Sequence, residues 1–242
     1  MYRARVSKNA GPQGGLDNMQ ALLADKGDVR MKVYCGSTAG KKMLSYLKEK
    51  NYGLMLNPLS WKYSQNSVFP WQYWALDNGA YKSYTDGVDF NAKNFLKTIY
   101  EKLPRSKMVP DFIVVPDKVG AGLDSLTFSL AWHSKLKYIK EYNWYLAVQD
   151  GMSIENVEKE LYSFDGIFVG GTVRWKVSTG EAWVNLAHKH NLPCHIGRVG
   201  TFKRIVWAKR IKADSIDSTN FVRNPDGFRP LESAKAQTLL EA

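Results

Sequence analysis

The sequence predicts an α/β fold, a single closed (βα)8 TIM barrel preceded by an N-terminal extension, and three observations support this prediction. Short continuous apolar runs recur along the chain, as is typical of parallel strands that are buried on both faces. Helical patterns alternate with these runs, which indicates parallel βα units. The runs number eight in a chain of 242 residues, which suits a closed barrel. An open doubly wound sheet is the alternative fold.

The predicted elements begin at Met31 and follow in order. Strands are predicted over residues 32–35, 52–56, 73–76, 112–115, 144–148, 166–169, 193–196 and 215–216, because these short runs are mostly apolar. Helices are predicted over residues 41–50, 90–103, 123–141, 154–161, 180–190, 202–209 and 231–240. The second unit is the weakest, because residues 57–72 show no helical period. We therefore expect an extension over residues 1–30 and one barrel domain over residues 31–242.

The composition is that of an ordinary globular protein except for its charge. Hydrophobic residues make up 44% of the chain and charged residues 24%, but the formal net charge is +11. Such an excess indicates a polyanionic partner, most often nucleic acid, although a merely basic enzyme is the alternative. The two cysteines, Cys35 and Cys194, are expected to be buried free thiols in a reducing cytoplasm. We see no apolar run long enough for a membrane span and no secretory leader, and expect a cytoplasmic protein.

Polar residues and glycines follow most of the predicted strands. In a parallel barrel the C-terminal ends of all strands open on one face, and that face holds the active site. Any one such segment is equally well explained as a turn or a helix cap. We call this face the mouth of the barrel. Carboxylates that recur after the third, fourth and eighth strands favour a functional site at the mouth. The segments are Asp77–Tyr81, Pro116–Lys118, Gln149–Gly151, Gly170–Thr172, Gly197–Thr201 and Asp217–Asn220.

Separated carboxylates, an amide and a glycine pair suit chemistry on a glycosidic bond. One carboxylate can attack the anomeric carbon and form a covalent intermediate, while the other moves the proton of the leaving group. The backbone N–H groups of a glycine pair can meet a carbonyl oxygen. A carboxylate can also accept hydrogen bonds from the N–H edge of guanine.

In their order along the chain, these segments resemble the motifs of the tRNA-guanine transglycosylase superfamily. Each motif is short, so the specificity of the resemblance comes from the ordered set, which covers roughly residues 31–223. The short chain is most similar to the 7-deazaguanine DNA transglycosylases of phages and bacteria, the DpdA type. The matching segments are Asp77–Tyr81, Val115–Asp117, Val148–Gln149, Val169–Gly171, Val199–Thr201 and Asp214–Asp217.

The resemblance implies a role for each matched residue. Asp217 matches the nucleophile, and Asp77 matches the general acid and base. By its position three residues before Asp217 and deeper in the strand, Asp214 is expected to be a supporting or structural carboxylate. The remaining matches concern the base: Tyr81 would stack on it, Asp117 and Gln149 would bind the edges of guanine, and Gly170 and Gly171 would donate backbone N–H groups to its carbonyl.

The chain also departs from the family pattern. The tRNA enzymes carry a zinc site of three cysteines and a histidine near the C-terminus, whereas this chain has only two cysteines in all. The zinc subdomain is therefore missing, which favours DNA over tRNA as the substrate. Ala80 replaces a motif glycine, and Arg198 stands in a segment one residue longer than the family's, so we expect the base pocket to differ there.

The sequence thus predicts an enzyme that exchanges guanine in DNA for a free 7-deazaguanine base without a metal or other cofactor. An RNA substrate, and a non-catalytic barrel that binds DNA through a basic rim, are the alternatives. His195 ends a strand and is expected to line the pocket. Four cations follow strand ends and are expected to contact phosphates at the rim: Arg174, Lys176, Arg198 and Arg223.

Overall fold

The computed structural model describes residues 31–241 except residues 39, 61–72, 107 and 225, with side chains up to residue 236. The chain divides into two units, residues 1–30 and residues 31–242. The second unit contains all the elements described below. The predictions for residues 1–30 and for most of the loop 57–72 lie outside the described residues.

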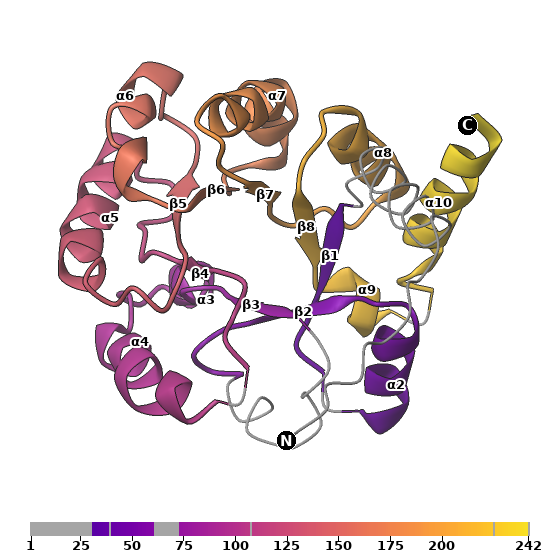
Figure 1. Ribbon diagram of the computed structural model, residues 1–242, viewed down its shortest axis with the longest axis horizontal. Helices are drawn as coiled ribbons and strands as arrows, with labels where there is room; N and C mark the ends of the chain where they lie inside the picture. The colour runs from indigo at the N-terminus through magenta and orange to yellow at the C-terminus, as the bar shows by residue number, and fades with distance from the viewer. Residues whose placement is uncertain (1–30, 39, 61–72, 107, 225, 242) are drawn as a thin grey trace, which may run out of the picture. The chain divides into compact units, whose positions relative to one another are not determined.

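Eight parallel strands close into a barrel, in which each strand pairs with the next along the chain and β8 pairs with β1. The predicted closed barrel is confirmed, and the open sheet is excluded. Figure 1 shows the strands as a ring. The strands are β1 (Lys32–Gly36), β2 (Gly53–Leu56), β3 (Trp74–Leu76), β4 (Ile113–Val114), β5 (Trp144–Val148), β6 (Gly166–Val169), β7 (Cys194–Ile196) and β8 (Ser215–Ser218).

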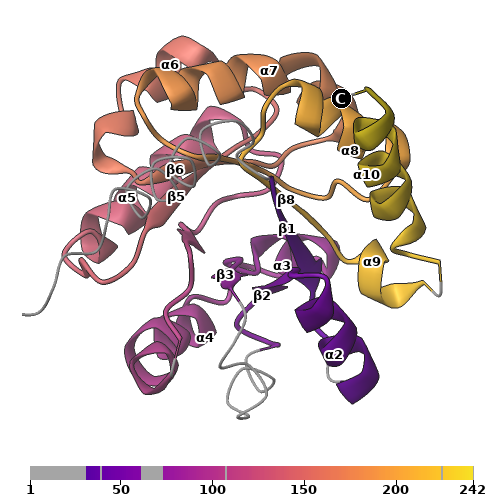
Figure 2. The same cartoon turned by 45° about the vertical axis from the view of Figure 1, so that its right-hand side comes forward.

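Helices follow the strands and lie on the outside of this ring, as Figures 1 and 2 show for α2, α4, α5, α7 and α8. A π-helical turn (Thr98–Lys102) and a 3-10 turn (Leu103–Arg105) continue α4, and a second 3-10 turn (Leu161–Ser163) follows α6. The helices are α2 (Lys41–Glu49), α3 (Ala80–Thr85), α4 (Ala92–Lys97), α5 (Leu123–Leu136), α6 (Ile154–Glu158), α7 (Val173–Lys189), α8 (Phe202–Arg210), α9 (Asn220–Arg223) and α10 (Arg229–Glu241).

Two helices differ from the predictions in a way that affects the mouth. The helix predicted from residue 180 begins at Val173, because Thr172 caps it by accepting a hydrogen bond from the N–H of Trp175. Gly180 therefore lies inside α7, where a Cβ atom would come within 2.7 Å of the ring of Trp207. A short helix, α3, also begins at Ala80, within the segment Asp77–Tyr81, where the sequence predicts no helix.

The barrel interior is a packed core of its own. Side chains alternate between the inside and the outside of each strand, so every second residue points inward. The rings of Phe112 and Tyr145 stack there at 4.1 Å, and Tyr34 meets Phe112 edge to face. A larger apolar cluster joins the strands to the helices, and both predicted free thiols, Cys35 and Cys194, are buried in it. The inner core closes the barrel below the C-terminal ends of the strands, where the candidate site lies.

Candidate active site at the barrel mouth

Asp77 is the first residue after β3, and its carboxyl is fixed by its own turn. Its Oδ1 atom accepts a hydrogen bond of 2.8 Å from the N–H of Gly79. Gly79 has a φ of 86°, a left-handed conformation that turns the chain from the strand into α3. Burial raises the pKa of Asp77 to about 6; the N–H of Gly79 opposes this shift, and the charge of Asp217 adds to it. A carboxyl with this pKa can both give and take a proton near neutral pH.

Asp217 belongs to β8 itself, and its side chain is only 11% exposed. Its Oδ1 atom lies 3.0 Å from Nε2 of His195, and it accepts a hydrogen bond of 3.1 Å from the backbone N–H of Arg198. The charge of Asp217 is close enough to Asp77 to raise its pKa. The strands β3 and β8 therefore bring two carboxylates to one mouth, as the sequence predicts.

His195 does not line an open pocket, in contrast to the prediction. Its side chain is fully buried in the barrel interior, where its ring stacks on Phe168 at 4.9 Å. Its Nδ1 atom lies 2.8 Å from the hydroxyl oxygen of Ser215. The reason is its position on β7: an inward residue within the strand packs in the barrel, below the mouth.

Asp117 and Gln149 lie together, as residues that follow the neighbouring strands β4 and β5. Nε2 of Gln149 donates to Oδ2 of Asp117 at 3.2 Å, and Nδ2 of Asn78 donates to Oδ1 of Asp117 at 2.8 Å. Burial raises the pKa of Asp117 to about 6, and the hydrogen bonds from Asn78 and Gln149 oppose this shift. Gln149 also binds the carbonyl of Lys118 and the hydroxyl of Ser125. In this structure the amide of Gln149 is thus engaged by the loop after β4.

The two glycines after β6 differ in their available groups. The N–H of Gly170 donates to the carbonyl of Val148 at 2.8 Å, so it is already used by the sheet. Gly171 has a φ of 69°, and a Cβ atom there would lie 2.5 Å from Oδ2 of Asp150. The N–H of Gly171 donates to no residue that the structure describes. Of the predicted glycine pair, only Gly171 keeps a backbone donor for a carbonyl oxygen.

Arg198 lies across the mouth. Its backbone is left-handed, with a φ of 58°, and its guanidinium lies over the ring of Tyr81 at 4.5 Å. The same guanidinium donates to the carbonyl of Gly171. Arg198 thus links the segments that follow β3, β6 and β7, and it covers one face of the Tyr81 ring. Tyr81 itself is 46% exposed.

Lys176 is not at the exposed rim, which corrects its predicted role as a phosphate contact. It is 2% exposed, and its Nζ atom donates to the carbonyl of Gly197. Burial lowers its pKa to about 7; the charge of Arg198 adds to this shift, and the charge of Asp217 opposes it. The first turn of α7 carries Lys176 inward, whereas Arg174 and Arg223 are exposed, and their contact with phosphates stays a prediction.

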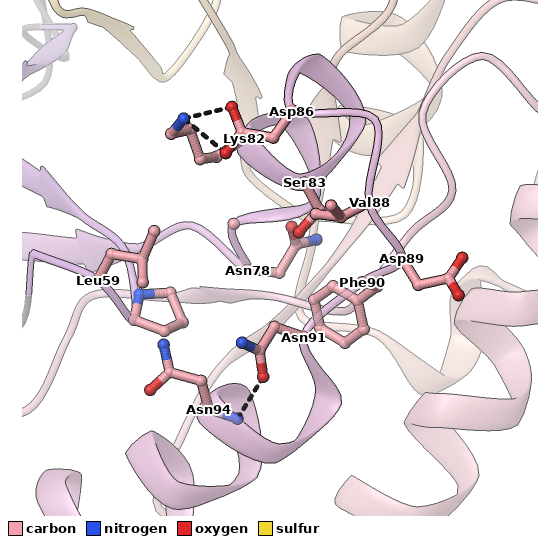
Figure 3. A pocket seen from close by; sticks show the side chains of 12 residues that line it. Leu59, Asn78, Lys82, Ser83, Asp86, Val88, Asp89, Phe90, Asn91 and Asn94 are labelled. Carbon is pink, nitrogen blue, oxygen red and sulfur yellow. Dashed lines mark hydrogen bonds and ion pairs between the residues drawn. The ribbon is translucent and has the colours of Figure 1, made fainter.

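A cavity of about 330 Å³ lies beside the mouth and shares Asn78 and Gly79 with the segment after β3. Figure 3 shows the pair formed by Lys82 and Asp86 beside it, and the hydrogen bond from the N–H of Asn94 to Oδ1 of Asn91. Neither predicted catalytic carboxylate lines this cavity. The predicted catalytic carboxylates therefore lie at the strand ends and not in this cavity.

Sequence reasoning missed two parts of the site. Asn78 anchors the mouth through Asp117 and the carbonyl of Val115, and its place in the Asp77–Tyr81 segment could have indicated it. Ser215 binds the ring of His195, and only the inward period of β8 could have suggested that contact. Among the described residues, no cluster of three or more His, Cys, Asp or Glu side chains could hold a metal ion.

Comparisons with known proteins assign no family. No protein-family model matches the chain, and no curated protein is significantly similar to it. Within the described part of the chain, no helix is long and apolar enough to cross a membrane. The chemistry of the site must therefore be argued from its own residues.

Proposed function

We propose that this chain is a transglycosylase that replaces guanine in DNA with a free 7-deazaguanine derivative. The observation that supports this proposal best is the pair of unlike carboxylates at one barrel mouth. Asp217 is held by two hydrogen-bond donors, whereas Asp77 has a pKa of about 6. The donors to Asp217 suit a nucleophilic carboxylate, and the raised pKa of Asp77 suits a group that carries a proton in both directions.

In the first step, a carboxylate oxygen of Asp217 attacks C1′ of the target nucleotide through an oxocarbenium-like transition state. A bond forms between this oxygen and C1′, and the bond from C1′ to the guanine nitrogen breaks. The electron pair of the broken bond stays with guanine, which takes a proton from Asp77 and leaves as a neutral base. The sugar remains as an ester of Asp217.

In the second step, the incoming base displaces Asp217. Its ring nitrogen forms the new bond to C1′ and gives its proton to Asp77, while the electron pair of the ester bond returns to Asp217. The two half-reactions restore both carboxyl groups. They need no oxidant, reductant or metal.

Base recognition falls to the groups between the two carboxylates. Asp117 can accept hydrogen bonds from the N–H edge of a guanine-like base, and the N–H of Gly171 can donate to its carbonyl. A base that stacks on the face of Tyr81 that the guanidinium of Arg198 covers must displace that guanidinium. We propose that substrate binding moves Arg198.

A polynucleotide substrate accounts for the charge of the chain. The formal net charge of +11 favours a polyanion, and the exposed Arg174 and Arg223 can contact phosphates. The target nucleotide must leave the base stack, because a buried carboxylate at a barrel mouth cannot reach C1′ inside a duplex. DNA is preferred to RNA because the resemblance is strongest to the enzymes that act on DNA, and because the two cysteines of this sequence cannot supply the three that hold zinc in the tRNA enzymes.

The direct test is nucleoside mass spectrometry of DNA from cells that express this chain and produce 7-deazaguanines. Modified nucleosides are expected with the natural chain and not with Asp217→Ala. The RNA of the same cells is analysed in parallel, because modification of RNA alone would replace DNA as the substrate. If neither polymer is modified although the protein is folded, the proposed function is wrong.

A further inference from the structure

Three side chains form a buried line inside the barrel: the hydroxyl of Ser215, the imidazole of His195 and the carboxylate of Asp217. Nδ1 of His195 lies 2.8 Å from Oγ of Ser215, and Nε2 lies 3.0 Å from Oδ1 of Asp217. Counted over backbone and side chain together, His195 is 0% exposed, Ser215 is 6% exposed and Asp217 is 8% exposed. The catalytic scheme above uses Asp217 and leaves the other two without a role.

The contacts of the ring determine its tautomer. Burial lowers the pKa of His195, which favours the neutral imidazole, while the hydrogen bond to Asp217 opposes this shift. Oδ1 of Asp217 already accepts a hydrogen bond from the N–H of Arg198, so it is the acceptor toward His195 as well, and Nε2 carries the proton and donates to it. Nδ1 is then the acceptor, and the hydroxyl of Ser215 must donate to it.

The imidazole is also fixed in orientation. Its ring stacks on Phe168 with an interplanar angle of 15°, and it contacts Phe112 and Tyr34 at 5.2 Å and 5.7 Å between ring centroids. These aromatic rings leave it little freedom to rotate, and they exclude water from the hydrogen bond to Asp217. Water therefore does not compete for this hydrogen bond, and the ring that makes it is held in one orientation.

Only one of the two carboxylate oxygens of Asp217 takes part in these hydrogen bonds. Oδ1 accepts one hydrogen bond from Nε2 of His195 and one from the N–H of Arg198. No described residue donates to Oδ2. The two donors thus leave Oδ2 as the oxygen that is available for attack.

We propose that His195 is a positioning residue that holds Oδ1 of Asp217 through its Nε2–H, presents Oδ2 to the substrate and makes Asp217 a better leaving group in the second step. This inference rests on the proposed transglycosylase function. The leaving-group effect follows from charge: the donor stabilises the free carboxylate more than the neutral sugar ester. Without the donor, the balance between free enzyme and covalent intermediate shifts toward the intermediate.

The test uses two substitutions of one residue. His195→Gln keeps an N–H donor in place of Nε2–H, whereas His195→Leu removes it and keeps a bulky side chain in the core. His133→Leu is the matched control, because His133 is another buried histidine, 4% exposed and stacked on Phe164 at 4.2 Å, but on α5 outside the barrel. Ser215→Ala, which removes only the donor to Nδ1, is the milder variant if His195→Leu fails to fold.

The first readout is the fraction of protein trapped as a covalent adduct with a guanine-containing DNA duplex at a fixed concentration of free guanine, measured by denaturing electrophoresis. We expect His195→Leu to shift the equilibrium toward the adduct by ~10-fold to 100-fold, the range expected for one hydrogen bond to a charged group. His195→Gln and His133→Leu should stay within a few-fold of the natural chain (~3-fold). A purely structural histidine would lower the melting temperature without raising the adduct fraction, and that result would overturn the proposal.

The second readout needs no substrate. In ¹⁵N-edited NMR spectra of the histidine rings, His195 should show the Nε2–H tautomer at neutral pH, and Ser215→Ala or Asp217→Asn should change its ring shifts. An Nδ1–H tautomer would overturn the proposal whether or not the chain acts on DNA. Absence of any adduct with the natural chain, together with the expected tautomer, would instead refute the transglycosylase function and with it the role of His195 in the second step.

Discussion

The substitution Asp77→Asn is expected to stabilise the protein near neutral pH and to slow base exchange. In the unfolded chain Asp77 ionises near its usual pKa of 3.8, whereas in the folded protein burial raises the pKa to about 6. Between these pH values the folded protein binds more protons than the unfolded chain, so its free energy of unfolding falls as the pH rises. The buried carboxylate of Asp77 therefore lowers the free energy of unfolding by its full amount above about pH 6 and has no effect on it below about pH 4.

The size of the effect follows from the same pKa values. The interval between 3.8 and about 6 corresponds to roughly 3 kcal/mol, at about 1.4 kcal/mol per pKa unit. Because Asp77 keeps part of its surface in contact with solvent, the effect is smaller than this. We expect Asp77→Asn to raise the free energy of unfolding by about 1–2 kcal/mol. Asparagine can still accept the hydrogen bond from Gly79 through its side-chain oxygen. For a protein of this size the melting temperature should rise by roughly 2–8 °C.

The assay is urea denaturation of the natural chain and of Asp77→Asn at pH 4 and at pH 7.5. The gain in stability should be present at pH 7.5 and absent at pH 4. Asp86→Asn is the control, since Asp86 forms an exposed pair with Lys82 and should change stability by less than about 1 kcal/mol. An equal gain at both pH values, or none at pH 7.5, would refute the reasoning. Base exchange should fall by a factor of about 10² to 10⁴, the usual effect of removing a general acid or base.

Two further predictions concern the mouth and its rim. Gly171→Ala should lower the melting temperature and base exchange together, because a Cβ atom would lie 2.5 Å from Oδ2 of Asp150 on a backbone with a φ of 69°; unchanged values in thermal unfolding and exchange assays would contradict this. Arg174→Ala and Arg223→Ala should each reduce the slope of log K against log salt for duplex binding by about 1, as fluorescence anisotropy can measure. Lys189→Ala, at the other end of α7 where Lys189 pairs with Glu158, should leave the slope unchanged. Equal slopes for all three variants would refute a rim interface.

The sequence predicts the barrel well because its strands are buried on both faces. The strand predicted over residues 144–148 is β5, and the strand predicted over residues 166–169 is β6. These runs are apolar throughout, so burial and strand propensity indicate the same element. The helix predicted from residue 180 starts instead at Val173, because the local hydrogen bond of Thr172 sets the start and Trp207 packs against Gly180.

The sequence predicts part of the site, and the predictions that are wrong or missing have a common cause. The sequence gives the strand end at which each residue lies, and so brings Asp77, Asp117 and Asp217 to one mouth. It does not give the direction of side chains in the first turn of a following helix, so the burial of Lys176 could not be foreseen. Nor does it give the register between β7 and β8, which pairs His195 with Ser215. Contacts that depend on register and helix orientation require coordinates.

Isotope exchange with purified protein tests the central claim most directly. A guanine-containing DNA duplex is incubated with free ¹⁵N-labelled guanine, and the nucleosides of the recovered DNA are analysed by mass spectrometry. The natural chain should incorporate the label into deoxyguanosine, and a folded Asp217→Ala variant should not. Incorporation by Asp217→Ala at the natural rate would contradict the role of Asp217, and absence of incorporation by the natural chain into both DNA and RNA would contradict the transglycosylase function itself.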